Sequence, residues 1–254
     1  MLTTFENVLL VIFCPLGALL FLWILNRVWP PSHRRQHNDI IGWQIGTLGT
    51  IYAVIMGFML YAVWTSFQEA QVNAETEANC LVNVYRMANG LPSPQREQIR
   101  SLARKYADIV IQEEWPGMHE GQLNLSGHNT IQQMWTTMLE TKPSTFGEQT
   151  SMNLTLTELS SMTHHRRVRQ IESQSKLPGV LWMVLIAGGV ITMLSSCLFG
   201  VENARLHRLQ VVILTILVTL ILVATADIDR PFQGVIHIMP TGFERARATF
   251  AETP

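Results

Sequence analysis

Four long apolar runs without charged residues constrain the fold of this chain more than any other feature. They are rich in Leu, Ile, Val and Phe and cover Val8–Asn26, Ile40–Phe67, Leu177–Val201 and Leu209–Ala226. Each run approaches or exceeds the ~20 residues that a helix needs to cross the apolar core of a bilayer. One such run could be a buried helix of a soluble protein, but four runs in one chain favour a membrane protein. We therefore predict an all-α protein with four transmembrane helices, at about residues 8–28, 41–67, 178–201 and 209–226.

The connections between these runs predict two antiparallel hairpins, at residues 1–67 and 177–226. Arg27–Asp39 joins the first pair of runs and Glu202–Arg208 joins the second, and such short links place neighbouring helices side by side. The N-terminal run follows a start without Lys or Arg and is longer than the apolar core of a secretory signal, so we expect a retained helix. Four spans place both termini and residues 68–176 on the same side of the membrane.

Residues 68–176 are polar and are predicted to form a helical extramembrane segment that extends the transmembrane bundle. No strand pattern occurs in this segment, and prolines divide it into several helices. In its first part, small and apolar residues recur at helical spacing, and polar residues form a second face. The apolar face comprises Ala70, Ala74, Ala78, Leu81 and Tyr85; the polar face comprises Glu69, Asn73 and Glu77. Residues 227–254 are interpreted as a C-terminal tail.

The distribution of Lys and Arg gives a divided prediction of membrane orientation. The two short connecting loops carry the denser set of basic residues, whereas the opposite side carries more of them in total. Since long segments count less in the positive-inside rule, charge alone slightly favours an exported middle segment. The lone Cys80 in that segment favours a reducing compartment instead.

A stripe of small residues on the second apolar run is the first candidate for a functional surface. Gly42, Gly46, Gly49, Ala53 and Gly57 recur at spacings of three and four, which places them on one helical face. Thr47 and Thr50 border this stripe. Small faces allow two helices to approach closely, and they can also line a pore in which ions bind weakly. Tight packing and pore lining both remain open, and they are compatible in an oligomer.

Charged residues at the end of the fourth run and before the third run form two further candidate sites. Asp227, Asp229 and Arg230 meet the predicted membrane edge, where they would form either an ion-binding or gating site or an interfacial salt bridge before a turn. Arg166, Arg167 and Arg169 would either contact anionic lipids or ions, or form a solvated helix face.

The remaining candidates for chemistry favour a protein that is not an enzyme. Glu113 and Glu114 precede Trp115–Pro116 without an accompanying nucleophile, so a helix stop is the preferred interpretation. His33 and His37 stand four apart, but they follow two prolines in a polar link, and no Cys-x-x-Cys pair is present. We expect no catalytic residues, no metal and no cofactor. A formal net charge of −1 gives no reason to expect a nucleic-acid partner.

Several landmarks, taken together, resemble the bacterial family of bestrophin-like membrane proteins along nearly the whole chain. They occur in order as Glu69-Ala70, Glu114-Trp115-Pro116, Arg166–Arg169, Leu177-Pro178 with Trp182, and Asp229-Arg230-Pro231-Phe232 with Gly234. The resemblance implies a homo-oligomeric ion channel, typically a pentamer that passes mostly anions, in the inner membrane. It also implies cytoplasmic termini and a cytoplasmic middle segment, against the charge-density argument.

In bestrophins the second span lines the pore and carries an apolar neck. The resemblance makes Ile51, Ile55 and Phe58 the neck candidates here, although they lie off the small-residue stripe. Its implied partners are the lipid bilayer, further copies of the chain, and ions. The alternative function is a non-conducting membrane scaffold or sensor that binds a partner through residues 68–176.

Overall fold

A computed structural model describes residues 4–252, and all regular elements in that range are helical. The chain forms two compact units. Unit 1 contains the residues up to Thr65 and Lys176–Asp229, and unit 2 contains Ser66–Ser175 and the residues from Arg230 onward. The helix α3, Asn38–Met87, contributes its first part to unit 1 and its second part to unit 2.

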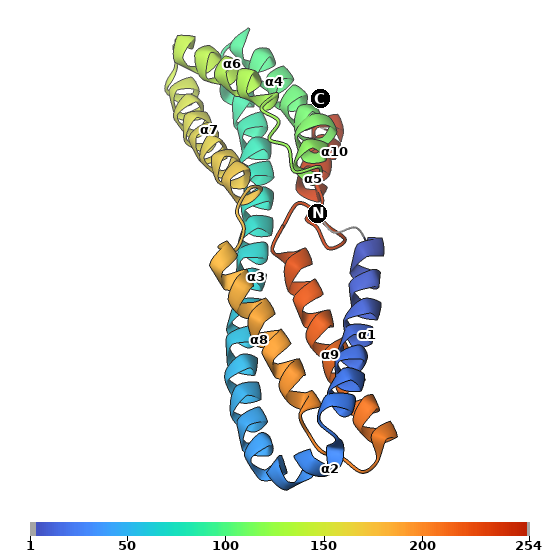
Figure 1. The fold of residues 1–254 in the computed structure, drawn as a ribbon. Coiled ribbons are helices and arrows are strands. Elements are labelled where there is room, and N and C mark those ends of the chain that lie inside the picture. Colours follow the sequence, from blue (N-terminus) through green and yellow to red (C-terminus); the bar gives the residue numbers. More distant parts are fainter. Residues whose placement is uncertain (1–3, 253–254) are drawn as a thin grey trace. The chain divides into compact units, whose positions relative to one another are not determined.

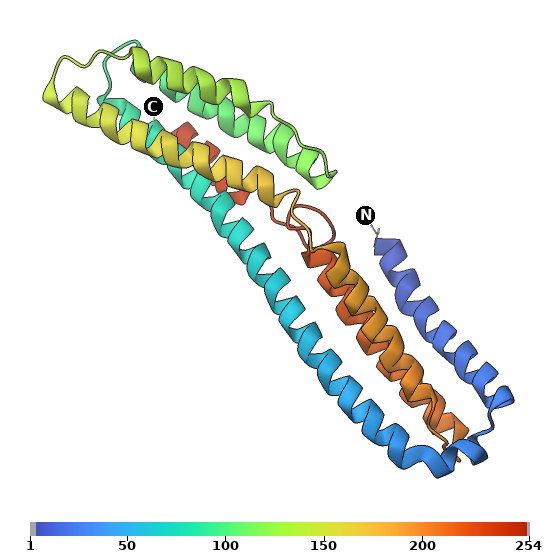
Figure 2. The same cartoon turned by 60° about the vertical axis from the view of Figure 1, so that its left-hand side comes forward.

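Unit 1 contains the predicted spans. α1 (Thr4–Val28), the first part of α3, α8 (Gly179–Cys197) and α9 (Ala204–Ile228) run side by side in Figures 1 and 2. A short helix α2 (Pro31–Arg34) and a 3-10 turn η1 (Arg35–His37) join α1 to α3. Within residues 4–252, four helices are long and apolar enough to cross a membrane, which confirms the four-helix prediction.

Small apolar clusters and hydrogen bonds between the two connecting loops stabilise unit 1. Leu22, Cys197 and Val211 join α1, α8 and α9. At the end of the bundle, buried Arg34 donates from Nη1 to the carbonyl oxygen of Cys197 at 2.6 Å. Asn38 exchanges two hydrogen bonds with the backbone of Gly200, at 3.0 and 2.9 Å. The two connecting loops are therefore tied together by groups that would be costly to bury without partners.

Unit 2 is a helical assembly around the second part of α3. Its other elements are η2 (Ala88–Gly90), α4 (Gln95–Ile109), the π-helical turn η3 (Val110–Glu114), α5 (Trp115–His119), α6 (Gly127–Glu140), α7 (Phe146–Glu172) and α10 (Thr241–Glu252). The predicted apolar face of α3 is buried throughout, from Ala70 to Tyr85. α7 begins with a capping box, in which the Thr145 hydroxyl accepts from the Glu148 amide and the Glu148 carboxylate accepts from the Thr145 amide.

The C-terminal residues belong to the core of unit 2. Phe232, Phe243 and Phe250 are all buried, and the rings of Phe250 and Tyr85 stack with centroids 4.3 Å apart. α10 packs against α4. The sequence argument gave these residues no packing role, because their apolar content is spread over a turn-rich stretch and a short helix.

Candidate functional site

Within unit 1, α3 packs on the other spans through one narrow face. Tyr52 and Met56 form a cluster with Leu185 of α8 and Val218 of α9. The Tyr52 hydroxyl donates to the carbonyl oxygen of Leu185 at 3.1 Å. Gly188 gives the ring room, since a Cβ there would lie 2.6 Å from Tyr52 Cδ2. This face, and not the stripe from Gly46 to Gly57, therefore packs α3 against α8 and α9.

The glycine stripe of α3 is open in the described structure. A Cβ placed at Gly46, Gly49 or Gly57 would meet no atom within 4 Å, apart from the helix's own nearby backbone. At Gly42 a Cβ would only reach ordinary contact with the Phe199 ring, at 3.7 Å. Ala53 is also exposed. Among residues 4–252, no other helix therefore packs against the stripe from Gly46 to Gly57.

The threonines beside the stripe satisfy their own hydroxyl groups. Thr47 donates to the Trp43 carbonyl oxygen at 3.0 Å, and Thr50 donates to the Gly46 carbonyl oxygen at 2.8 Å. Each hydroxyl still presents an acceptor oxygen at the helix surface. Such a surface tolerates either lipid or a partly hydrated conduit.

The three neck candidates do not share one environment. Ile51 and Phe58 expose 54% and 70% of their surface, whereas Ile55 packs against the Tyr52 cluster. Ile51 and Phe58 are therefore exposed, and Ile55 faces α8 and α9.

The carboxylate at the end of α9 has a structural role. Asp229 accepts from the Leu177 amide at 2.9 Å and from Trp182 Nε1 at 3.3 Å. It thus joins the end of the fourth span to the start of the third. Asp227 and Arg230 are partly buried, and their gating role stays a prediction.

The basic run of α7 lies largely inside unit 2. Arg169 donates from Nε and Nη2 to the two carboxylate oxygens of Glu77, at 2.6 and 3.0 Å, and from Nη2 to Glu114 Oε2 at 2.8 Å. Arg166 Nη2 donates to Glu114 Oε1 at 2.6 Å. The Tyr106 hydroxyl donates to Glu77 Oε1 at 2.5 Å. The result is a four-membered ion network, Glu77–Arg169–Glu114–Arg166, in which two carboxylates balance two guanidinium groups.

Burial and the neighbouring charges shift the pKa values of Glu114 and Arg169 in opposite directions. Burial by itself would raise the pKa of Glu114, but Arg169 and Arg166 hold that pKa below its usual range. Burial would lower the pKa of Arg169, but Glu77 holds it well above its usual range. Burial raises the pKa of Tyr106, and the adjacent Glu77 raises it further. Glu114 and Arg169 are therefore charged, and Tyr106 is a neutral donor.

This network changes the interpretation of two sequence motifs. Arg166 and Arg169 are buried and neutralised, so of the predicted lipid-contacting residues only Arg167 is exposed. The helix stop predicted at Trp115–Pro116 is wrong, because the helix continues as α5 to His119, with Pro116 tolerated in its first turn. Glu114 was missed as a structural residue. No sequence signal links it to its partners, because Arg169 lies 55 residues away and Arg166 lies 52 residues away.

No group of three His, Cys, Asp or Glu side chains within residues 4–252 is placed to hold a metal ion. The three cysteines, Cys14, Cys80 and Cys197, are unpaired thiols.

Comparison with known proteins agrees with this architecture. Residues 12–243 match the Bestrophin-like domain family. A mutant of a bacterial Bestrophin homologue from Klebsiella pneumoniae is similar in structure with a TM-score of 0.72 at 13% identity, over 95% of this chain and 99% of that one. A crystal structure of a bacterial Bestrophin homologue from Klebsiella pneumoniae, solved by Zn-SAD phasing, gives a TM-score of 0.70 at 12% identity, over 95% of this chain and 97% of that one. At such identity the structural likeness shows the fold alone, and no curated protein matches the sequence. The family match covers most of the chain, and the described residues contain four apolar helices. The chain therefore belongs to the Bestrophin-like family of membrane proteins.

Proposed function

We propose that this protein is a homo-oligomeric ion channel whose conduit is lined by α3. One observation carries the proposal: from Gly46 to Gly57 the small-residue stripe of α3 contacts no other part of the described chain. In a bilayer, an open stripe of this kind is either covered by a helix of another copy or lines a pore. Family membership supports the same function.

The exposed side chains of α3 are suited to weak, non-specific ion contact. Small residues and the acceptor oxygens of Thr47 and Thr50 give a surface of low polarity, across which ions bind loosely enough to leave. Ile51 and Phe58 supply bulk for an apolar constriction, which gates by excluding water. By resemblance we propose a pentamer in the inner membrane that mostly passes anions, with residues 68–176 in the cytoplasm and Asp227 and Arg230 as candidate gating groups.

Ion flux in reconstituted liposomes tests the proposal directly. The purified protein is expected to release chloride, and to a smaller extent potassium, from loaded vesicles. Particle imaging of the same sample is expected to show a ring with an axial opening. A ring that passes neither ion over a range of pH and calcium concentration would favour the non-conducting scaffold instead, and a monomer would exclude both the pore and the proposed assembly.

A matched pair of glycine substitutions separates pore lining from general effects on membrane helices. Gly49→Leu adds bulk to the open stripe of α3, whereas Gly17→Leu adds the same bulk to an exposed, equally open position of α1. We expect Gly49→Leu to reduce flux at least about tenfold with the ring intact, and Gly17→Leu to leave flux within about twofold. Equal loss in both variants would argue against α3 as the conduit. Loss of the ring in Gly49→Leu alone would assign the stripe to subunit packing.

A further inference from the structure

Two loops of unit 2 lie in contact and carry no charged residue. The first loop, residues 121–127, leads into α6, and the second loop, residues 231–240, leads into α10. Neither contains Asp, Glu, Lys or Arg, whereas α4 of the same unit carries a charged residue in every turn. A Cβ at Gly121 would lie 3.2 Å from Gln233 Nε2, so the two loops form one continuous surface.

Five large apolar side chains are exposed on this surface, each over between 42% and 60% of its area. They are Leu123, Leu125, Val235, Ile236 and Met239, and we call them the apolar loop surface. Exposed apolar groups that are gathered in this way mark a site of contact with lipid or with another protein, because their contact with water is unfavourable.

Both loops turn a polar side chain inward and leave apolar side chains outside. In the first loop Asn124 is half-buried and its Nδ2 donates to the carbonyl oxygen of Glu113 at 3.4 Å, while the leucine on either side is exposed. In the second loop Gln233 is buried, whereas Val235 and Ile236 are exposed. A loop in water usually shows the opposite arrangement, with its polar side chains outside. The inverted arrangement suits a surface that contacts lipid.

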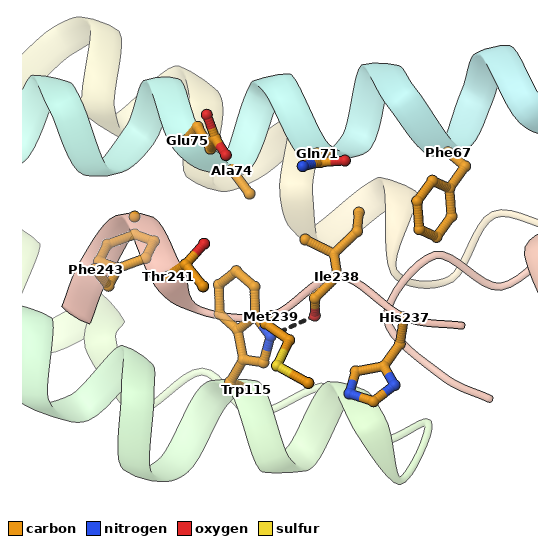
Figure 3. A pocket seen from close by; sticks show the side chains of 11 residues that line it. Phe67, Gln71, Ala74, Glu75, Trp115, His237, Ile238, Met239, Thr241 and Phe243 are labelled. Carbon is orange, nitrogen blue, oxygen red and sulfur yellow. Dashed lines mark hydrogen bonds between the residues drawn. The ribbon is translucent and has the colours of Figure 1, made fainter. Parts of the chain in front are cut away.

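The second loop is held firmly at its base. The Ile238 amide donates to the carbonyl oxygen of Pro231 at 2.8 Å, which closes the loop on itself. Phe232 and Ile238 are buried, and Trp115 Nε1 donates to the carbonyl oxygen of Ile238 at 2.9 Å, beside the small cavity that Figure 3 shows. Gly234 permits the turn between them with a φ of +88°. The exposed tip of the loop is thus presented by a fixed turn.

The chain itself tethers this loop to the membrane. α9 is apolar enough to cross a bilayer and ends at Ile228, and Pro231 follows three residues later. Three residues span at most about 11 Å, and the hydrogen bond from Ile238 returns the loop to Pro231. The interfacial layer of a bilayer extends about 5–7 Å beyond each side of the apolar core. The base of the loop is therefore within reach of this layer, which makes the bilayer the partner that the chain favours.

We propose that the apolar loop surface inserts into the interfacial layer of the bilayer beside the fourth span. Its five side chains bury against the acyl chains next to the headgroups, as the apolar face of an interfacial helix does. This contact attaches unit 2 to the membrane in addition to its covalent links with the spans. It is independent of conduction, because its residues all lie in unit 2 and the stripe of α3 lies in unit 1.

Quenching of a fluorescent label by lipid tests the proposal. Val235→Cys and Leu125→Cys each place a bimane label on the apolar loop surface, and Leu139→Cys places one on an exposed leucine at the other end of α6. The full chain is reconstituted in liposomes that contain phosphatidylcholine with a nitroxide at the fifth acyl carbon. We expect this lipid to quench the first two labels at least about threefold more strongly than the third, and aqueous iodide to show the reverse order.

Two results of this experiment would overturn the proposal. If iodide quenches the labels at positions 125 and 235 as strongly as the label at position 139, the apolar loop surface lies in water. If neither quencher reaches the labels at positions 125 and 235, the surface is covered by protein, such as a second copy of the chain. The unaltered protein, whose three thiols are buried or half-buried, gives the background labelling.

A charge placed in the second loop tests the cause of the contact. Ile236→Asp, added to the labelled Val235→Cys protein, should reduce quenching by the lipid about threefold, because a carboxylate is costly to remove from water. Leu139→Asp, added to the same labelled protein, should leave the quenching unchanged. Since the two loops carry no Asp, Glu, Lys or Arg, the quenching should also be equal at about 0.05 M and about 0.5 M salt. Quenching that survives Ile236→Asp, or that is lost at high salt, would contradict insertion by apolar contact.

Discussion

The two units of this protein differ in the kinds of side chain that they expose and bury. Unit 1 leaves large apolar side chains on its surface, such as Trp43 at 74% and Ile40 at 69% exposure. Unit 2 instead encloses two carboxylates and two guanidinium groups, with Glu77 and Arg169 fully buried. In lipid, apolar surface costs nothing and helices associate by close contact of their backbones. A unit in water gains from apolar burial, and an enclosed ion network then specifies which helices pair, at some cost in desolvation. The same helix, α3, contributes small residues to the first environment and charged residues to the second.

Removal of the Arg169 side chain should have the largest effect on stability, because it leaves the carboxylates of Glu77 and Glu114 buried without this partner. We expect Arg169→Leu to destabilise unit 2 by about 3–5 kcal/mol, as is usual when one member of a buried ion pair is lost. Hydrogen exchange of α3, α4 and α7 amides measures the change within unit 2. Arg167→Leu, at an exposed neighbouring position, should change stability by less than about 0.5 kcal/mol. Equal effects of the two substitutions would show that the network does not stabilise unit 2.

Added bulk at Gly188 should disturb unit 1 by sterics alone. A methyl group there would collide with the Tyr52 ring, with the nearest atom at 2.6 Å, so we expect Gly188→Ala to destabilise unit 1 by about 1–3 kcal/mol. The matched substitution Gly179→Ala meets no atom within 4 Å and should be neutral or slightly stabilising. Thermal unfolding in detergent, followed by circular dichroism, checks both. If Gly188→Ala melts like Gly179→Ala, then α3 and α8 do not pack as described.

A half-buried carboxylate, Glu172, should make the stability of unit 2 depend on pH. Burial raises the pKa of Glu172 to about 7, and the charge of Glu69 adds to this effect, whereas a hydrogen bond from Asn73 at 3.2 Å opposes it. Because the folded protein holds this proton more tightly than the unfolded chain, stability should fall as pH rises from about 4.5 to about 7 and then level off. The loss should be about 1 kcal/mol, since the carboxylate is only half buried and solvent screens its charge.

Two substitutions isolate this pH dependence. Glu172→Gln should remove it from hydrogen exchange of the α7 amides, and Glu69→Gln should reduce it by removing the charge that raises the Glu172 pKa. Glu97→Gln, in exposed α4 surface, should leave it unchanged. A dependence that survives Glu172→Gln would belong to another group.

Loss of a helix cap should have the smallest effect on stability. The effect can be compared between the two units, because each has a capped helix. Thr145 caps α7 in unit 2 and Asn203 caps α9 in unit 1, where its side chain accepts from the Arg205 and Leu206 amides. Thr145→Ala should cost about 1 kcal/mol, visible as faster hydrogen exchange in the first turn of α7. Asn203→Ala should cost a similar amount at the start of α9 if that turn lies in water. A change in α9 of less than about 0.3 kcal/mol would indicate that its first turn is stabilised by other contacts.

Local pattern was enough to predict the helices themselves. An uncharged run of ~20 apolar residues can satisfy its backbone in lipid only as a helix, so the four spans follow from composition and length. The alanine face of α3 was predicted for the same kind of reason, since spacing along one helix decides which side chains share a face, and Ala70–Tyr85 is buried as expected.

Contacts between residues far apart in sequence were decided by the tertiary structure alone. Glu114 and Arg169 are 55 residues apart and Trp115 and Ile238 are 123 apart, and no periodicity along the chain links such positions. The sequence predicted Glu77 on a polar helix face, because charged side chains normally lie in solvent. Glu77 is buried instead, because its ion pair with Arg169 offsets the free-energy cost of removing the carboxylate from water. The sequence by itself thus determined that this chain spans a membrane with four helices. The tertiary structure decided that the glycine stripe of α3 stays open while the arginines of α7 are enclosed, because exposure depends on what the rest of the chain places nearby.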